Sequence, residues 1–304
     1  MKHLLTGTAV AALLAVGLSA CTNASTDPGA TGGVDVPDAS DQVDVATDQA
    51  AADLLPADIA KTGTIKVAMD ASYPPFEMFA PDNKTIVGFD ADFATAVAQK
   101  LGLKVELVNA GFDTILTGLA AGRYDLAESS FSITPERQQV VDFVTYLQGG
   151  AGIAVRPGNP EDLSMDPMVL CGHKIAAQKG TTQAIEQLPA IRQQCIDAGK
   201  EPVEPELFPS QNDAILALNS GRVDGMMADS TAISYQGALA GGKFELAPGD
   251  IYESRPTGIA LPKDSPLRAA VAAAVTSLYD DGTVATLTKK WNIPDTNLAP
   301  NPGS

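Results

Sequence analysis

Two stretches of the chain decide its fold: DTILTGLAAGRYD (residues 113–125) and DAILALNSGRVD (residues 213–224). Both place apolar residues at helical spacing, then a glycine that ends the helix, then the first residues of a strand. The spacing within them differs by one residue. Such units recur in any α/β protein, so chance is the alternative to an internal repeat. We interpret the pair as a sign of two lobes of similar build, with the functional site between them.

The segments around the first stretch continue an alternation of strands and helices. The predicted strands span residues 64–69, 104–109 and 124–129. The predicted helices span residues 92–101 and 113–121, and a third begins at Thr134 with Pro135 in its first position. This order predicts an α/β fold in which each lobe has a mainly parallel sheet flanked by helices.

The first 20 residues are typical of a bacterial export signal. Lys2 precedes an apolar run, residues 4–17, that is too short to stay in a bilayer as a spanning helix. A buried N-terminal helix is the alternative interpretation. The run ends in Leu18-Ser19-Ala20-Cys21, which resembles the lipobox of bacterial lipoproteins. That resemblance implies a lipid on Cys21 and anchoring to the extracytoplasmic face of the cell membrane. Residues 21–53, rich in Asp, Gly, Ala, Thr and Ser, are predicted to be a disordered tether.

Charge and cysteine content narrow the class of protein. The 304 residues carry a formal net charge of -17, which argues against nucleic acid as a partner, since phosphate binding needs clustered Lys and Arg. With Cys21 assigned to lipid, Cys171 and Cys195 remain as a pair, and in an exported protein such a pair predicts a disulfide. Two reduced buried thiols are the alternative. We find no spacing typical of metal ligands and no nucleophile paired with a histidine, so we predict no metal, no cofactor and no enzyme.

A series of short motifs carries a family resemblance over about residues 54–294. The motifs are DASYPPF (70–76), VGFDAD (87–92), GRYD (122–125), SITPER (132–137), GTTQ (180–183) and GRVD (221–224), followed by Asp229. In this order they resemble the family 3 solute-binding proteins, which bind polar amino acids for ATP-driven (ABC) importers and have the type II periplasmic binding fold. The resemblance implies a monomer that captures an amino acid in a cleft between lobes and delivers it to an ABC permease.

The resemblance also implies how the chain is divided. Lobe 1 would combine residues 54–153 with 253–297, lobe 2 would span residues 154–252, and residues 298–304 would form a loose tail. Two crossings, near residues 149–152 and 252–258, would form the hinge. The glycines of the first crossing suit that role by themselves, because a hinge must absorb changes in backbone dihedral angles.

Two charged residues are the main candidates for ligand binding. An amino acid presents a carboxylate and an ammonium group on the same carbon atom. Arg137 can donate two parallel hydrogen bonds to the carboxylate, and it lies in the first turn of the helix that begins after Thr134, where free N–H groups also favour an anion. Asp229 follows a predicted strand and is the candidate partner of the ammonium. The alternatives are a surface ion pair for Arg137 and a helix N-cap for Asp229, although capping and binding are compatible.

The remaining site candidates match family positions. Ser130 and Ser132 resemble contacts to the amino and carboxylate groups, and Thr181 and Thr182 resemble residues that close over the carboxylate, with N-capping as their alternative. Tyr73 and Phe112 resemble the aromatic walls of the site, with ordinary core packing as their alternative. Asp70 and Ser129 match positions that meet the far end of the ligand side chain. An acid at position 70 suits a cationic ligand, although it also occurs in relatives with neutral ligands.

One departure from the family pattern keeps the substrate open. Glu128 stands where relatives usually have an apolar residue, and the sequence leaves open whether it faces the cleft. If it does, a dehydratase acting on a cyclic carboxylate is a rival reading, with Arg137 holding the carboxylate and Glu128 acting as the acid. A ligand-sensing partner of a signalling receptor is a second rival.

Overall fold

The computed structural model describes residues 36–37 and 43–304. The predicted export signal, the lipidation candidate Cys21 and most of the predicted tether lie outside these residues. None of the helices in the described part of the chain has the length and apolar character needed to cross a membrane.

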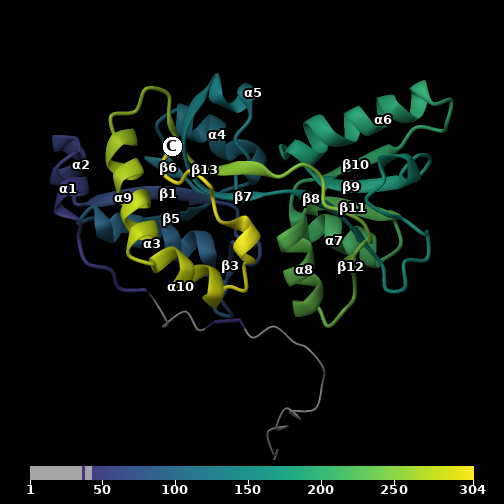
Figure 1. The fold of residues 1–304 in the computed structure, drawn as a ribbon, viewed down its shortest axis with the longest axis horizontal. Helices are drawn as coiled ribbons and strands as arrows, with labels where there is room; N and C mark the ends of the chain where they lie inside the picture. The colour runs from purple at the N-terminus through teal and green to yellow at the C-terminus, as the bar shows by residue number, and fades with distance from the viewer. Residues whose placement is uncertain (1–35, 38–42) are drawn as a thin grey trace, which may run out of the picture. The chain divides into compact units, whose positions relative to one another are not determined.

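The first sheet has five strands in the order β5-β1-β6-β13-β7 (Figure 1). They are β1 (Thr64–Met69), β5 (Lys104–Asn109), β6 (Leu126–Ala127), β7 (Val141–Gly149) and β13 (Arg255–Pro262). β5, β1 and β6 are parallel, as predicted, whereas β13 is antiparallel to both β6 and β7. The antiparallel half arises because β7 leaves this sheet toward the next one and β13 returns from it.

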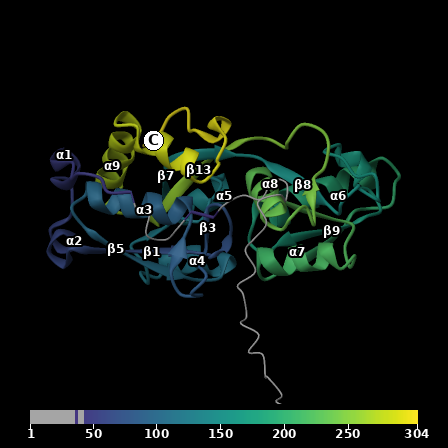
Figure 2. The same cartoon turned by 90° about the horizontal axis from the view of Figure 1, so that it is seen from below.

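Helices cover both faces of the first sheet. On one face α3 (Phe89–Lys100), α9 (Arg268–Asp280) and α10 (Thr283–Lys290) share a core with Ile65 and Val67 of β1. On the other, α4 (Phe112–Ala120) packs on Ala68 and Ala127. Figure 2 shows α9 and α4 on opposite sides of the sheet. The alternation of side chains along β1 therefore buries both of its faces.

Smaller elements complete this part of the chain. They are α1 (Gln49–Ala52), α2 (Ala57–Thr62), α5 (Pro135–Gln138), η3 (Asp295–Asn297) and a three-stranded sheet of β2 (Ser72–Tyr73), β3 (Glu77–Phe79) and β4 (Ile86–Val87). Helix α3 begins three residues earlier than predicted, at Phe89. It is preceded by Gly88, whose φ is 138° and where a Cβ atom would lie 2.1 Å from the Phe76 carbonyl oxygen. Only glycine permits that approach of β3 to the helix start.

The second sheet repeats the arrangement in the order β10-β9-β11-β8-β12. Its strands are β8 (Ala151–Val155), β9 (Lys174–Gln178), β10 (Glu204–Phe208), β11 (Gly225–Asp229) and β12 (Glu245–Leu246). Its helical elements are η1 (Pro167–Val169), η2 (Gln183–Gln187), α6 (Leu188–Asp197), α7 (Gln211–Asn219) and α8 (Ser230–Leu239). The predicted disulfide is present: Cys171 and Cys195 are bonded, with their Cα atoms 5.6 Å apart, and tie the turn after η1 to α6.

The internal repeat predicted from the sequence is confirmed atom by atom. Helices α4 and α7 are each followed by a glycine in the left-handed region, with φ 71° at Gly122 and 72° at Gly221. Three residues later an aspartate accepts a hydrogen bond from a backbone N–H of the neighbouring strand, β1 in the first sheet and β9 in the second. Asp125 does so from Lys66 and Asp224 from Lys174, both at 2.8 Å. The two stretches therefore build the same helix–turn–strand corner in each sheet.

Two segments connect the sheets. The first runs from β7 through Gly150 into β8, and the second runs from Tyr252 into β13. They touch closely, because the Tyr252 N–H donates to the Ala151 carbonyl at 2.8 Å and a Cβ atom on Gly150 would lie 2.3 Å from the Tyr252 carbonyl oxygen. The glycine at position 150 is thus required by the contact between the two crossing segments.

Two predictions about loose segments are wrong. Residues 43–53, assigned to the tether, lie against α3 and α9: the Val45 N–H donates to Gln99 at 3.0 Å and Ala51 of α1 is fully buried. The predicted tail, residues 298–304, is also attached. Thr145 exchanges hydrogen bonds with Gly303 (2.9 Å) and Ser304 (3.0 Å). The reason is that β7 is an edge strand, and its free backbone groups are satisfied by the C-terminal residues.

Candidate functional site: a cleft between the two sheets

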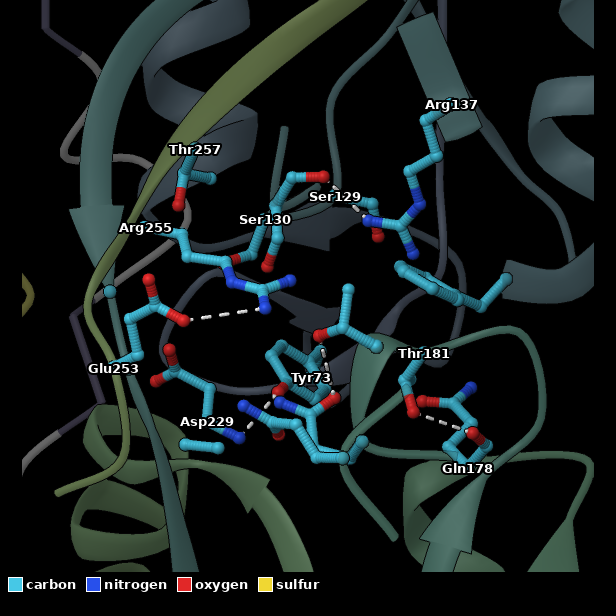
Figure 3. Close-up of a pocket in the computed structure, with 18 residues that line it drawn as sticks. Tyr73, Ser129, Ser130, Arg137, Gln178, Thr181, Asp229, Glu253, Arg255 and Thr257 are labelled. Atoms are coloured by element: carbon cyan, nitrogen blue, oxygen red, sulfur yellow. Dashed lines mark hydrogen bonds and ion pairs between the residues drawn. The ribbon is translucent and has the colours of Figure 1, made fainter. Parts of the chain in front are cut away.

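A small cavity lies where the two sheets face each other (Figure 3). Nine of the ten ligand-binding candidates line it: Tyr73, Phe112, Ser129, Ser130, Ser132, Arg137, Thr181, Thr182 and Asp229. Asp70 does not. The cavity volume is about 30 Å³, far below the roughly 300 Å³ of ordinary small-molecule sites. The structure therefore shows a closed cleft, which must open before an amino acid can enter.

Arg137 lies in the first turn of α5, where the Thr134 hydroxyl caps the Arg137 N–H as predicted. Its guanidinium donates to the Ser132 carbonyl (2.8 Å) and, across the cleft, to the Gly180 carbonyl (2.9 Å). It also lies 5.7 and 5.4 Å from the ring centres of Phe112 and Phe131. Burial lowers the pKa of Arg137 to about 10, so the side chain stays charged at neutral pH.

This cation forms no ion pair with a carboxylate of the residues that the structure describes. None of the ion pairs formed by the described residues involves Arg137, although the side chain is only 7% exposed. A buried charge without a counter-ion is costly. An arrangement of this kind suits a site whose counter-ion is supplied by a ligand, and the surface ion pair considered as the alternative is absent.

Asp229 ends β11 and caps α8. Its Oδ1 atom accepts from the N–H groups of Thr231 (2.9 Å) and Ala232 (3.0 Å), so the capping role considered from the sequence is confirmed. Its Oδ2 atom points the other way, toward Gly149, where a Cβ atom would lie 2.8 Å from it. Desolvation raises the pKa of Asp229 to about 6. One oxygen therefore holds the helix while the other stays available to the cleft.

The aromatic candidates form part of the walls. The Tyr73 hydroxyl accepts from the Asp229 N–H at 3.1 Å and thereby joins the two sides. Phe112 stacks on Phe131 with ring centres 4.7 Å apart. The rings of Tyr73 and Phe112 line the cavity and also pack against the protein core. Core packing, the alternative considered from the sequence, is therefore compatible with their place in the cavity wall.

Two threonines lie at the start of η2. The Thr181 hydroxyl donates to the Gln178 carbonyl (2.8 Å) and accepts from the Ala184 N–H (3.3 Å), which is the capping arrangement considered as its alternative. Thr182 is 4% exposed, precedes η2 and lines the cavity.

Asp70 lies one step behind the cavity wall. Its Oδ2 atom accepts from Gln178 Nε2 across the cleft (2.7 Å) and from the Phe112 N–H (3.2 Å). Its own N–H donates to the Ser129 hydroxyl at 3.1 Å. In the closed cleft Gln178, which lines the cavity, thus lies between the cavity and the carboxylate of Asp70.

Glu128 faces away from the cleft. It is fully buried, and neither of its carboxyl oxygens has a hydrogen-bond partner among the described residues. Burial and the nearby Asp90 raise the pKa of Glu128 well above its usual range, which keeps the group protonated and neutral. The acid on which the dehydratase reading depended is therefore outside the cavity lining.

Several lining residues were not identified from the sequence. They are Gln178, Gln183, Gln187, Glu253, Arg255 and Thr257. Arg255 pairs with Glu186 (2.5 Å) and Glu253 (3.4 Å), so it carries its own counter-ions and differs from Arg137 in this respect. Its position inside the predicted second crossing, residues 252–258, was the available signal, because a charged side chain at a hinge faces both lobes.

Comparisons with known proteins identify the family and the fold. Residues 65–294 match the bacterial extracellular solute-binding proteins, family 3. The chain is 30% identical over 242 residues to the arginine-binding protein of Corynebacterium glutamicum, covering 80% of this chain and 78% of that protein. A mutant of the arginine-binding protein of T. maritima superposes with a TM-score of 0.69 at 29% identity, over 80% of this chain and all of that one. An ancestral amino acid-binding protein, described as a precursor of cyclohexadienyl dehydratase, gives a TM-score of 0.68 at 31% identity, over 77% of this chain and 97% of that one.

Proposed function

The chain belongs to the bacterial extracellular solute-binding proteins of family 3 and captures an amino acid for delivery to an ABC importer, and from this premise we propose that Arg137 and Asp229 bind its α-carboxylate and α-ammonium groups. The observation that carries the proposal is the buried, unpaired guanidinium of Arg137. A ligand carboxylate would supply its missing counter-ion. The free Oδ2 atom of Asp229 lies on the opposite side of the same cavity.

The ligand in this proposal is a cationic amino acid of the arginine class. Asp70 supports it, since its carboxylate lies at the end of the cleft next to Phe112 and Gln178. The names of the Corynebacterium and T. maritima relatives point to the same class. Opening of the cleft would replace the Gln178–Asp70 contact by one between Asp70 and the ligand side chain.

Arginine and citrulline distinguish a cationic from a neutral site of the same shape. We expect calorimetry on protein freed of bound ligand by unfolding and refolding to show binding of arginine at least about tenfold tighter than citrulline, because citrulline lacks the charge that Asp70 would meet. Asp70→Asn should remove that preference. Equal affinities for the two ligands would reject the cationic class, and binding of neither, with binding of another amino acid, would reject the substrate but leave the cleft assignment intact.

Closure would proceed from one side of the cleft to the other. The first sheet's side offers Arg137 and the serines, and closure adds Thr182 and Asp229 from the second sheet's side. The ligand shifts the equilibrium between open and closed forms only by its preference for the closed form.

Attachment to the membrane is a separate part of the proposal. The lipobox at residues 18–21 supports lipidation of Cys21, extracytoplasmic anchoring and a monomeric body on a tether of residues 22–42. Mass spectrometry of the mature N-terminus should find a lipidated Cys21, and Cys21→Ser should release the protein from the membrane fraction. An unmodified Cys21 in the mature chain would contradict the anchor.

We propose binding without turnover. The position of Glu128 outside the cavity lining supports this choice over a dehydratase. The appearance of product from a cyclic carboxylate incubated with the purified protein would overturn it.

A further inference from the structure

Three fully buried carboxyl groups lie beneath the serines of the cleft. Glu77 on β3, Asp90 on α3 and Glu128 after β6 are each 0% exposed, and we call them the acid cluster. Asp90 lies in the VGFDAD motif (87–92), but the proposed capture of the ligand gives none of the three acids a role. Their hydrogen bonds link them to Ser129 and Ser130 of the cleft.

Two members of the acid cluster bind the serines directly. The Ser129 hydroxyl donates to Glu77 Oε1 at 2.6 Å, and the Ser130 N–H donates to Asp90 Oδ2 at 2.8 Å. From the far side, the Tyr146 hydroxyl of β7 donates to Asp90 Oδ1 at 2.8 Å. Asp90 is therefore fixed between β7, an edge strand of the first sheet, and Ser130, which lines the cavity.

Ser130 has a backbone conformation that needs such support. Its φ is 47°, in the left-handed region that residues with a Cβ atom avoid. The hydrogen bond from its N–H to Asp90 holds this conformation. Because the N–H points down to Asp90, it is the hydroxyl and carbonyl of Ser130 that are left for the cleft.

Asp90 also acts electrostatically on the other side of the cleft. Asp229 lines the same cavity as Ser130, whose N–H Asp90 binds. Burial is the main cause of the raised pKa of Asp229, and the charge of Asp90 raises it further. The titratable groups that face Asp90 are Glu77, Glu128, Tyr146 and Asp229. Burial raises the pKa of Asp90 to about 6, whereas it raises the pKa values of Glu77 and Glu128 well above their usual range. At neutral pH Asp90 is thus the ionised member of the acid cluster, and its two neighbouring glutamates are neutral.

We propose that Asp90 is a positioning residue of the binding site, which holds Ser130 in its left-handed conformation and places a second buried negative charge near Asp229, on the side where the ligand's ammonium group binds. The inference rests on the proposed function, because it assumes that the ammonium group lies beside Asp229. It assigns a role in ligand affinity to a residue that never touches the ligand.

The test compares Asp90→Asn with Asp90→Ala, and uses Glu128→Gln as the matched control on a neighbouring buried acid. Asparagine keeps an oxygen for the Ser130 N–H and removes the charge, whereas alanine removes both. Calorimetry with the best amino acid ligand is run from pH 4.5 to 8.5, with thermal unfolding of each variant as the check on folding.

We expect Asp90→Asn to weaken binding about tenfold at pH 8 and Asp90→Ala to weaken it by about a further tenfold. In the wild type, affinity should fall below about pH 6 with close to two linked protons, one on Asp90 and one on Asp229. In Asp90→Asn this decline should be shallower and should occur at lower pH, because Asp229 no longer faces a negative neighbour. Glu128→Gln should match the wild type at pH 7.

If the affinity of Asp90→Asn depends on pH in the same way as that of the wild type, the inference is overturned. Equal affinities of the asparagine and alanine variants at pH 8 would also overturn it. If the alanine variant does not fold, the pH profile of Asp90→Asn decides. Failure of the wild type to bind any amino acid would instead reject the proposed function.

Discussion

Replacing Arg137 by methionine separates function from stability at one position. Methionine keeps much of the length and the apolar contacts with Phe112 and Phe131, but it carries no charge. The ligand carboxylate would then be buried without its cation, which costs about 3 kcal/mol or more and weakens binding at least about 100-fold. For the ligand-free protein, in contrast, the structure predicts almost no change in the free energy of unfolding.

Stability of the ligand-free Arg137→Met variant should hardly change. The variant loses two hydrogen bonds, to the Ser132 and Gly180 carbonyls, worth about 1 kcal/mol each. It also removes a buried cation that forms no ion pair among residues 36–37 and 43–304, a gain of similar size. We expect the free energy of unfolding to change by less than about 1 kcal/mol.

Calorimetry and urea unfolding measure the two quantities on the same preparation. Arg123→Met is the matched control, because Arg123 is an exposed arginine of the same sheet region and does not line the cavity. It should leave affinity unchanged. Binding within threefold of wild type in Arg137→Met would refute the carboxylate role, and a loss of several kcal/mol of stability would show that Arg137 is instead a structural residue.

Three further predictions concern other parts of the chain. Asp229→Asn keeps an oxygen to cap α8 but loses the charge, so binding should weaken by about 2 kcal/mol or more with little change in melting temperature; calorimetry beside thermal unfolding checks this, and unchanged affinity would remove Asp229 from the ammonium site. Lowering the pH from 7 to 5 should stabilise the ligand-free protein, because the folded pKa values of Asp90 and Asp229 are raised to about 6 and the native state therefore takes up protons that the unfolded state does not; a urea midpoint that falls over this range would contradict the assignment. Replacing both Cys171 and Cys195 by serine opens a loop with a sequence separation of 24 and should cost roughly 3 kcal/mol of stability, measured by urea unfolding, while ligand affinity stays the same because neither sulfur lines the cavity.

Much of the fold was predictable because its signals are local. Strands β1 and β5 have the predicted bounds, and the helix stops at Gly122 and Gly221 follow from the left-handed conformation that glycine accepts. Errors occurred where distant segments decide the structure. Residues 43–53 and 298–304 read as polar and loose, yet they attach to α3, α9 and β7, which lie elsewhere in the sequence.

Some residues of the candidate site could be chosen from local sequence signals, and others could not. Arg137 and Asp229 could be chosen from the sequence, because one begins a capped helix and the other follows a strand. Gln178 and Arg255 could not, since each reaches the cleft from a segment whose partner lies far away along the chain: Asp70 for Gln178, and Glu186 for Arg255.

By itself, the sequence determined that the chain has two similar helix–turn–strand corners, that Cys171 and Cys195 form a pair, and which residue types are candidates for binding an amino acid. These features depend on residue spacing and on backbone preferences that act over a few residues. Only the tertiary structure decided that Glu128 lies in the core although the next two residues, Ser129 and Ser130, line the cleft. These residues follow the end of β6, and Ser130 has a left-handed backbone, so strand alternation does not give their directions. Which side chain enters the core and which the cleft depends on the sheets and helices packed around the segment.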